Sequence, residues 1–291
     1  MSPAQMTDEL RWYLITKKKT EGLIASAFRR LREDGIEPVL IKGWAAARNY
    51  PDGKPRFLGD IDLAVAADDF ERSKLLVEAP DSGIIGVDLH RELRRLDTVD
   101  WATLFANAEL VAIDGEDVRV LAPEDHLRVM CVHWLTDGGE SKERLWDIYY
   151  AVQNRPANFD WAKCLEVVEP NRRGWIIATI GLANRYLGLA IDDLPFAAEA
   201  RCLPAWLTRC VEREWKSELP MRPMETVIDD AGSLMTEVRR RIPPNPIQAT
   251  VNCEGVFDDR SRVPYQIRDL FMRARPSIKR VFQGMLIRMR R

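Results

Sequence analysis

Three aspartates lie on two short segments in which polar and apolar residues alternate. Asp60 and Asp62 lie within residues 59–65, and Asp88 lies within residues 85–90. Two carboxylates about 4 Å apart repel each other by roughly 4 kcal/mol at an effective dielectric constant of about 20, so a cation is the simplest way to hold three together. Oxygen ligands of this kind suit Mg²⁺ or Mn²⁺, and two such ions can hold the attacking and leaving oxygens of a phosphoryl displacement. The aspartates therefore indicate metal-dependent phosphoryl chemistry.

The alternation predicts that both segments are β-strands, because successive side chains of a strand point to opposite faces. The apolar face of each strand would meet a core: Ile61, Leu63, Val65, Ile85, Val87 and Leu89. The other face carries the aspartates and His90. Asp60 and Asp62 could instead lie exposed on an edge strand, but aspartate is disfavoured in strands, and two on one face favour a site. His90 lies beside Asp88 and either contacts phosphates or the acceptor, or is a partly buried histidine with satisfied hydrogen bonds.

A Lys-Gly turn precedes the aspartates and supplies the positive half of the predicted site. Residues 37–41 are typical of a short buried strand, and residues 44–50 are good helix formers. Gly43 would let a triphosphate approach the backbone, where the free amides of a helix start can donate to it. Lys42 and Arg56 can add positive charge. A Lys-Gly pair alone is more often a plain turn, but the two-aspartate strand that follows favours phosphate binding.

At these residues the chain resembles the polymerase-beta-like nucleotidyltransferase superfamily. The resemblance is to its uncharacterised bacterial branch, which has a Lys-Gly-x-Ala, Tyr-Pro and Arg-x-x-Gly-Asp-Ile-Asp-Leu-x-Val pattern. The matching positions are Lys42, Gly43, Ala45, Tyr50, Pro51, Arg56, Gly59, Asp60, Ile61, Asp62, Leu63 and Val65. The resemblance implies that Asp60 and Asp62 bind metal, and that Asp88 binds metal and helps to activate an acceptor hydroxyl. Residues predicted to contact the nucleotide here are Lys42, Gly43, Trp44, Arg56, Gly59 and His90. The superfamily often has Gly-Ser at this turn, whereas Trp44 follows Gly43 and offers no hydroxyl.

A second resemblance covers residues 118–125 and 142–148. They are similar to the strand, Pro-Glu turn and Lys-x-Arg-x-x-Asp-Ile helix of nucleotidyltransferase-like toxins and their relatives. This resemblance implies that Lys142, Arg144 and Asp147 approach the nucleotide. The alternative is a surface ion pair, because Arg144 and Asp147 are three residues apart on a helix.

Composition is that of an ordinary globular protein. The chain has 291 residues, of which 46% are hydrophobic, and a formal net charge of -2, so any nucleic-acid binding would require a local basic patch. No apolar run approaches the roughly 18 residues of a membrane span and no signal-like stretch precedes the first charges, which predicts a cytoplasmic protein. The five cysteines form no paired motif, which argues against a zinc or disulfide framework. His126 and His133 fall on an apolar helical pattern and are interpreted as structural.

The predicted class is α+β, with a small mixed sheet flanked by helices and followed by an all-helical C-terminal domain. One long or two short helices are expected over residues 7–34, a helix over 68–78, and a hairpin over 110–121 that turns at Asp114-Gly115. Further helices are predicted over residues 123–136, 141–153, 160–168, 172–188, 200–217 and 222–241. The predicted domains are a nucleotidyltransferase core at 1–122 with an N-terminal helix, a helical acceptor domain at 123–242, and a Pro-rich linker with a basic helical segment at 243–291.

The basic C-terminal segment interleaves arginine and lysine with apolar residues, and Asp269 is its single acid after residue 261. Such a segment can bind RNA, an acidic partner or an anionic membrane surface. The alternative is that its apolar stripe packs on the domain while its basic residues face solvent.

These patterns favour a metal-dependent nucleotidyltransferase. It would transfer a nucleoside monophosphate from a nucleoside triphosphate to a hydroxyl of an unknown acceptor, with release of pyrophosphate and with Mg²⁺ or Mn²⁺ as cofactor. One alternative is a nucleotide- or partner-binding module that keeps the fold without the chemistry, which Trp44 favours. Another is a toxin that modifies transfer RNA or protein, which the residue 142–148 helix and the basic C-terminus favour.

Overall fold

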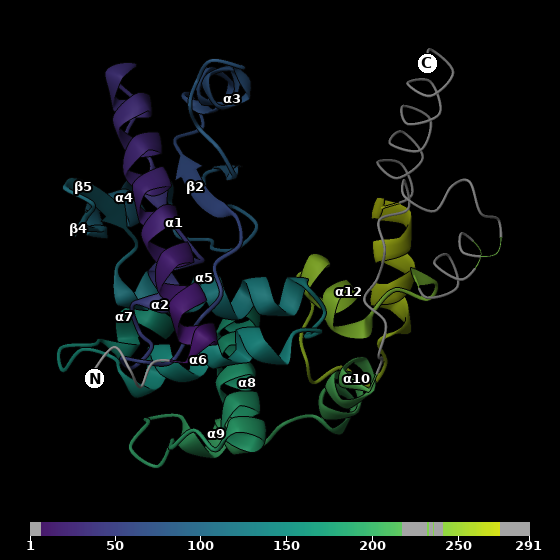
Figure 1. The fold of residues 1–291 in the computed structure, drawn as a ribbon. Helices are drawn as coiled ribbons and strands as arrows, with labels where there is room; N and C mark the ends of the chain where they lie inside the picture. The colour runs from purple at the N-terminus through teal and green to yellow at the C-terminus, as the bar shows by residue number, and fades with distance from the viewer. Residues whose placement is uncertain (1–6, 217–231, 233–234, 236–240, 274–291) are drawn as a thin grey trace.

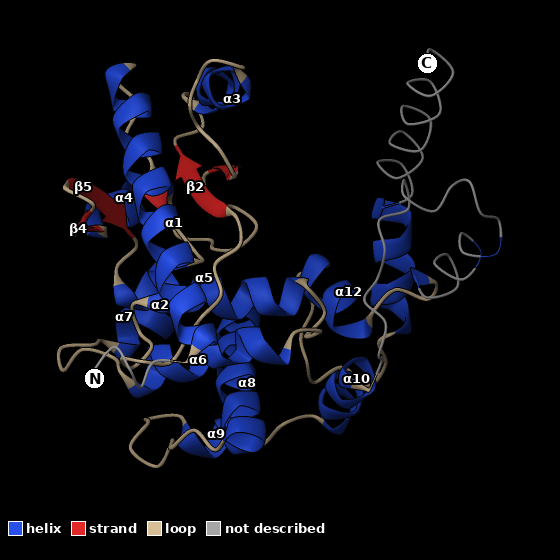
Figure 2. Cartoon of the chain, in the orientation of Figure 1, coloured by secondary structure: helices blue, strands red, loops and turns tan. Residues whose placement is uncertain are grey.

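The computed structural model describes residues 7–216, 232, 235 and 241–273. Within these residues a five-stranded sheet has the order β3-β2-β1-β5-β4 and mixes parallel with antiparallel pairs. The strands are β1 (Val39–Leu40), β2 (Ile61–Val65), β3 (Val87–Arg91), β4 (Glu109–Ile113) and β5 (Glu116–Val120). Helices flank this small sheet and make up the rest of the described chain (Figure 2). The predicted α+β class is confirmed.

The pairing directions bring one end each of β1, β2 and β3 to the same edge of the sheet. β1 runs parallel to β5 and antiparallel to β2, and β2 runs parallel to β3. The carboxyl end of β1 therefore lies at the same edge as the amino ends of β2 and β3. Lys42, which follows β1, and Asp62 and Asp88, which begin β2 and β3, all belong to this edge.

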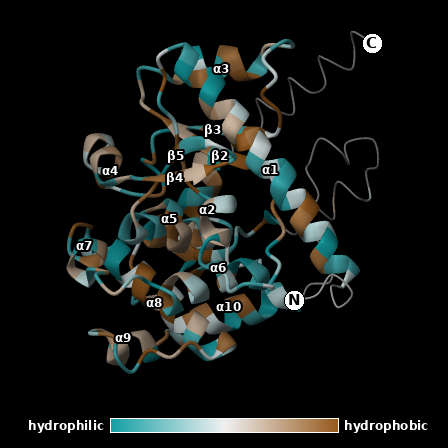
Figure 3. Ribbon diagram, turned by 60° about the vertical axis from the view of Figure 1, so that its left-hand side comes forward, coloured by the Kyte–Doolittle hydropathy of each residue, from teal (hydrophilic) through white to brown (hydrophobic). Residues whose placement is uncertain are grey.

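The N-terminal segment forms one helix, α1 (Asp8–Glu33), rather than two. The Thr7 hydroxyl accepts a hydrogen bond from the Leu10 amide at its start, and Gly35, with φ of 74°, follows its end. Polar and hydrophobic stretches alternate along α1 (Figure 3), which suits a helix with one buried face. That face covers the sheet through Ile24, Ala27, Phe28 and Leu31.

Three short helices connect the strands: α2 (Trp44–Ala47), α3 (Phe70–Glu78) and α4 (Trp101–Asn107). The predicted helix at 68–78 and the predicted hairpin are confirmed, and the hairpin turns at Asp114 and Gly115, both with positive φ. The prediction that Ile85 faces a core is wrong, because its side chain is 66% exposed. β3 begins only at Val87, after Gly86 with φ of 71°, so strand alternation does not extend back to Ile85.

The C-terminal half is helical. The helices predicted at 123–136, 141–153, 160–168 and 172–188 are present with small changes in their ends. The predicted helix at 200–217 is two helices, because Pro204 interrupts it. The helices of this half are α5 (Pro123–Thr136), α6 (Lys142–Gln153), α7 (Trp161–Leu165), α8 (Pro170–Leu187), α9 (Ala197–Arg201), α10 (Ala205–Trp215) and α12 (Pro246–Asn252) (Figure 1).

Two predictions fall partly outside the described residues. The predicted helix at 222–241 lies almost entirely outside them, and so does the basic segment from residue 274 onward. The predicted linker ends where α12 begins, with the Asn245 side chain accepting hydrogen bonds from the amides of Ile247 and Gln248. Residues 263–273 are helical, and Asp269 forms an ion pair there with Arg273. No helix within the described ranges is long and apolar enough to cross a membrane.

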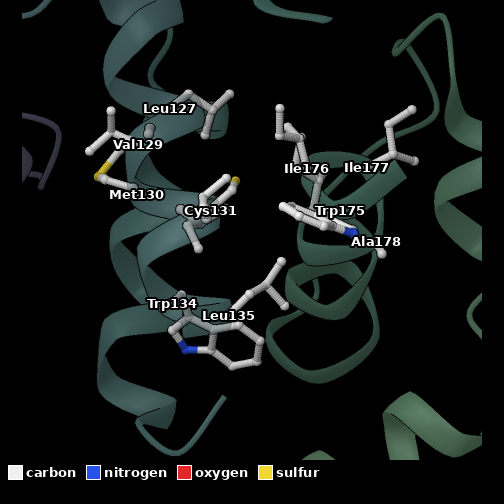
Figure 4. Packing of buried hydrophobic residues seen from close by; sticks show 14 of the residues in the cluster. Leu127, Val129, Met130, Cys131, Trp134, Leu135, Trp175, Ile176, Ile177 and Ala178 are labelled. Atoms are coloured by element: carbon white, nitrogen blue, oxygen red, sulfur yellow. The ribbon is translucent and has the colours of Figure 1, made fainter. Parts of the chain in front are cut away.

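Two hydrophobic clusters cover opposite faces of the sheet. Leu40, Leu63 and Val65 meet α1 on one face, whereas Val39 and Ala64 belong to the cluster that continues into the C-terminal helices. In that second cluster Leu127, Cys131 and Leu135 of α5 lie on the side of the helix facing Trp175 and Ile176 of α8 (Figure 4). One cluster therefore packs the sheet against the helices of the C-terminal half. The predicted domain division near residue 122 stays a prediction.

A close approach between α8 and α9 predicts a strong effect for one glycine. A Cβ on Gly181 in α8 would lie far inside van der Waals contact of the Ala200 carbonyl oxygen. Gly181→Ala is therefore expected to lower the free energy of unfolding by about 1–3 kcal/mol, because α8 and α9 must move apart. Urea denaturation measures this change. Gly174→Ala is the matched control on the same helix, since nothing lies within 4 Å of its added Cβ, and it should be neutral or slightly stabilising. Equal effects of the two substitutions would contradict the predicted close approach.

Candidate functional site

The register of β2 and β3 brings two predicted carboxylates and His90 together. Asp62 is the direct partner of Asp88 in the parallel ladder, and His90 lies two residues beyond Asp88 on the same face. One ligand atom from each of Asp62, Asp88 and His90 lies within 4.8 Å of the other two. The Asp62 side chain is 15% exposed, that of His90 is 25% exposed and that of Asp88 is 61% exposed. The group thus has one sheltered carboxylate at its base and one open to solvent.

Asp62 is the electrostatic centre of this group. The Lys42 ammonium lies 2.7 Å from its Oδ1, and Nε2 of His90 lies 3.1 Å from the same oxygen. Burial alone would raise the pKa of Asp62, but the hydrogen bond with His90 and the charge of Lys42 outweigh burial and lower that pKa. Asp62 is therefore ionised at neutral pH.

The donor set fits a divalent cation. Two carboxylates and one imidazole nitrogen converge from two neighbouring strands, and these ligand types bind Mn²⁺ and related ions as well as other divalent metals. Asp60 is exposed, precedes β2 and lies outside this group. Its predicted role as a metal ligand stays a prediction. The converging group contains His90 as its third member, whereas the sequence predicts Asp60 as the third metal ligand.

The Lys-Gly turn has the backbone conformation that requires glycine. Gly43 has φ of 57° and ψ of -107°, and a Cβ at this position would lie 3.4 Å from the Asp60 carbonyl oxygen. The helix that follows, α2, has only four residues and all of them are buried. Trp44 packs inward and donates from Nε1 to Glu21 of α1 at 3.1 Å. Trp44 thus anchors the turn to α1.

The two sequence patterns that suggested a nucleotidyltransferase meet in one ion pair. Arg56 donates from Nε and Nη2 to the two carboxylate oxygens of Asp147 at 2.8 and 2.7 Å. The Tyr50 hydroxyl donates to the same carboxylate at 2.8 Å, and burial raises the pKa of Tyr50. Nη1 of Arg56 donates to the carbonyl of Phe57. These contacts fasten the segment that leads to Gly59 and Asp60 onto α6.

Three residues of α6 are predicted to approach the nucleotide. Asp147 differs from the other two, because its carboxylate is bound inside the fold. It is buried and already accepts hydrogen bonds from Arg56 and Tyr50. Arg144 pairs with Asp137 at 2.5 Å, so the alternative of an ion pair between Arg144 and Asp147 is wrong. The Lys142 ammonium lies 5.5 Å from the centre of the Trp215 ring. Contacts of Lys142 and Arg144 with a nucleotide stay predictions.

His133 on α5 is a second histidine that the sequence predicts to be structural. Burial lowers the pKa of His133 to about 4, and Asp137, Lys42, Arg144 and Asp62 all contribute to its electrostatic environment. Nδ1 of His133 lies 3.6 Å from Asp137. α5 therefore places this ring next to the sheet edge that carries Asp62. The signal available in the sequence was weak, because the apolar helical pattern around His133 is equally typical of a structural histidine.

His126 was interpreted as structural, and the structure agrees with burial of its ring. Burial lowers its pKa to about 4, the ring makes a hydrogen bond with the Ile41 backbone, and its Nε2 has no hydrogen-bond partner among the described residues. The His126 ring thus binds a second proton more weakly in the folded protein than in the unfolded chain. Below pH 6.5 the ring is therefore protonated more in the unfolded chain than in the folded protein. The free energy of unfolding should thus fall as the pH drops from about 6.5 to about 4, by up to about 1.4 kcal/mol per pH unit from His126.

Urea denaturation of the wild type and of His126→Asn across this pH range tests that expectation. Asparagine keeps a side-chain N–H donor but does not titrate. The variant should therefore show a shallower pH dependence whatever its absolute stability. Equal slopes for the two proteins would contradict the assignment of a buried neutral ring.

Comparison with known proteins identifies the family of the chain. The chain belongs to a family described as uncharacterised nucleotidyltransferases, whose model matches residues 4–81 and 77–188 and so more than half of the chain. The match includes the Lys42 turn, β2, β3 and the α6 residue Asp147. Among solved structures, the chain is similar to an antigenic nucleotidyltransferase-like protein from Paracoccidioides brasiliensis, with 13% identity, a TM-score of 0.39, and coverage of 65% of this chain and 93% of that one. No curated protein sequence matches significantly.

Proposed function

We propose that the protein is a metal-dependent nucleotidyltransferase that transfers a nucleoside monophosphate from a nucleoside triphosphate to an acceptor hydroxyl, releasing pyrophosphate. The observation that carries the proposal is the convergence of Asp62, Asp88 and His90 at the sheet edge, with Lys42 on Asp62, in a chain of a nucleotidyltransferase family. A divalent ion bound there would neutralise charge on the phosphates and orient them for in-line displacement.

We propose different roles for Asp62 and Asp88, because their exposure to solvent differs. Asp62, sheltered at the base of the site, holds its negative charge against burial and serves as the fixed anchor for the cation. Asp88 is largely open to solvent and can reach an incoming acceptor. We assign to Asp88 the role of accepting the proton of the acceptor hydroxyl as that oxygen attacks the α-phosphate, with pyrophosphate as the leaving group.

Lys42 is the residue proposed to bind the triphosphate. Its ammonium contacts Asp62 and would turn from that carboxylate toward the phosphates when a nucleotide and a cation bind. Gly43 lets the phosphates approach the backbone at the same turn. Arg56 has its donors on Asp147 and on the Phe57 carbonyl, and we assign it the positioning of the segment that carries Gly59 and Asp60.

A binding module without chemistry is the second candidate. The observation in its favour is the Lys42–Asp62 ion pair, which stabilises the sheltered carboxylate without a metal. The toxin alternative stays a prediction, although the Asp147 carboxylate on which it partly depends accepts hydrogen bonds from Tyr50 and Arg56 inside the fold. Binding of RNA or of an acidic partner to that segment stays a prediction.

Transfer of label from α-phosphate-labelled nucleotides tests the proposal. Each of the four ribonucleoside triphosphates is incubated with the protein, Mg²⁺ or Mn²⁺, and lysate separated into RNA, protein and small-molecule fractions. Label should appear in one fraction, together with pyrophosphate. Pyrophosphate release distinguishes the two candidates, since both should bind nucleotide in calorimetry with each nucleotide and metal but a binding module never releases pyrophosphate. A wild type that neither binds nucleotide nor transfers label would overturn both.

A further inference from the structure

His90 occupies the position between the two carboxylates of the site. Its Nε2 lies 3.1 Å from Oδ1 of Asp62 and 3.4 Å from Oδ2 of Asp88, so this one nitrogen faces both ligands. The position is fixed by the backbone, because β2 and β3 pair in register along their whole length and His90 shares a face with Asp88. A cation that replaces the shared hydrogen-bonding proton would have the imidazole nitrogen as its third protein ligand.

We propose that His90 binds the metal through Nε2 and that the site therefore selects a first-row transition ion of the Mn²⁺ class over Mg²⁺. The proposal rests on the proposed function only in that it takes a divalent cation to occupy this site. It assigns His90 to the metal rather than to the phosphates or the acceptor, and it replaces Asp60 by a nitrogen ligand.

Ligand chemistry supports this selectivity. Mg²⁺ prefers oxygen ligands in a near-ideal octahedron and keeps several of its waters, whereas imidazole suits transition ions. Asp62, Asp88 and one neutral imidazole give a ligand set with two negative charges, which a single divalent cation neutralises. A set of three carboxylates would carry one more negative charge and would contain only oxygen, which is the arrangement that suits Mg²⁺.

Pulsed electron paramagnetic resonance of the full chain with Mn²⁺ alone tests the proposal without any activity. The wild type should show the modulation of a directly coordinated nitrogen nucleus. His90→Gln and His90→Asp should lose it, whereas His133→Gln on neighbouring α5 should keep it. Competition between Mn²⁺ and Mg²⁺ adds a second readout. The preference for Mn²⁺ should fall by about tenfold or more in His90→Asp, since losing even a supporting partner of a metal ligand costs 10–100-fold in affinity.

Circular dichroism and thermal melting of each variant first establish that it is folded. Failure of the wild type to bind Mn²⁺, Mn²⁺ bound without a coordinated nitrogen, or a nitrogen signal that survives in both His90 variants would each overturn the proposal. Nitrogen coordination in a protein that transfers no nucleotide would sink the proposed function and leave this inference standing. Nucleotide transfer with Mg²⁺ and no nitrogen coordination would do the reverse.

Discussion

Asp62→Asn is expected to lower nucleotidyl transfer by on the order of 100- to 1000-fold, the scale seen when one group that stabilises transition-state charge is removed. The substitution keeps the shape of the side chain but removes the charge on which Lys42 and His90 converge. Without that charge, the side chain no longer attracts the cation or the Lys42 ammonium. The turnover number from a label-transfer assay at saturating nucleotide measures the effect, and calorimetry with Mn²⁺ measures the accompanying loss of metal affinity.

Asp60→Asn is the informative control for this prediction. Sequence reasoning makes Asp60 and Asp62 equivalent, since both lie on the polar face of one predicted strand. In the structure Asp60 is exposed and precedes β2, whereas Asp62 belongs to the converging group. The Asp60 variant should therefore lose much less metal affinity than the Asp62 variant. Equal losses of metal affinity would support a site of three carboxylates and would contradict the assignment of His90 as a metal ligand.

Alternation of residue types was sufficient to predict which residues share a face but not which strands are neighbours. The period of two correctly placed Asp88 on the same face as His90, whereas Asp60 precedes β2 and lies outside the converging group. The contact between Asp62 and His90 depends on the parallel pairing of β2 with β3 in one register, which is a long-range property that no local pattern encodes. The same limit explains Ile85, because strand alternation was continued past Gly86 although the strand begins only at Val87.

The charge argument from the sequence considered only a metal as the source of positive charge at the site. Three carboxylates in one place require positive charge, and the sequence reasoning supplied it with a metal. In the structure the Lys42 ammonium already lies on Asp62, and Asp88 is open enough to be solvated. Lys42 had been assigned to phosphates because the Lys-Gly turn precedes a helix. Its position on a carboxylate follows from the antiparallel pairing of β1 with β2, which sets the end of β1 against the start of β2.

The helical half shows why local patterns misjudge polar residues on helices. Asp147 and Arg144 are three residues apart, which is the spacing of a helix surface pair. Tertiary contacts override that spacing, since Arg56 reaches Asp147 from the β1–β2 connection and Asp137 takes Arg144. His133 was likewise indistinguishable from a core histidine until the packing of α5 brought it near Lys42 and Asp62.

Removal of Asp147 is expected to give the largest loss of stability at the site. Its carboxylate is almost buried and accepts three hydrogen bonds, two from Arg56 and one from Tyr50. Asp147→Ala would leave the Arg56 guanidinium, itself only 16% exposed, without its counter-ion. Breaking one side of a buried ion pair costs about 3–5 kcal/mol, and this is the expected decrease in the free energy of unfolding, measured by urea denaturation.

A double-mutant cycle separates this positioning role from direct contact with the nucleotide. Arg56→Met combined with Asp147→Leu removes both charges and should recover part of the stability lost in Asp147→Ala, because an apolar pair replaces a buried ion pair at little cost while the Tyr50 hydroxyl still loses its acceptor. If Asp147 acts only by holding the segment before Gly59, the double variant should keep its nucleotide affinity, because the apolar pair still holds that segment. Full stability with nucleotide affinity abolished would instead assign Arg56 or Asp147 to the nucleotide itself, as the resemblance to nucleotidyltransferase-like toxins implies for Asp147.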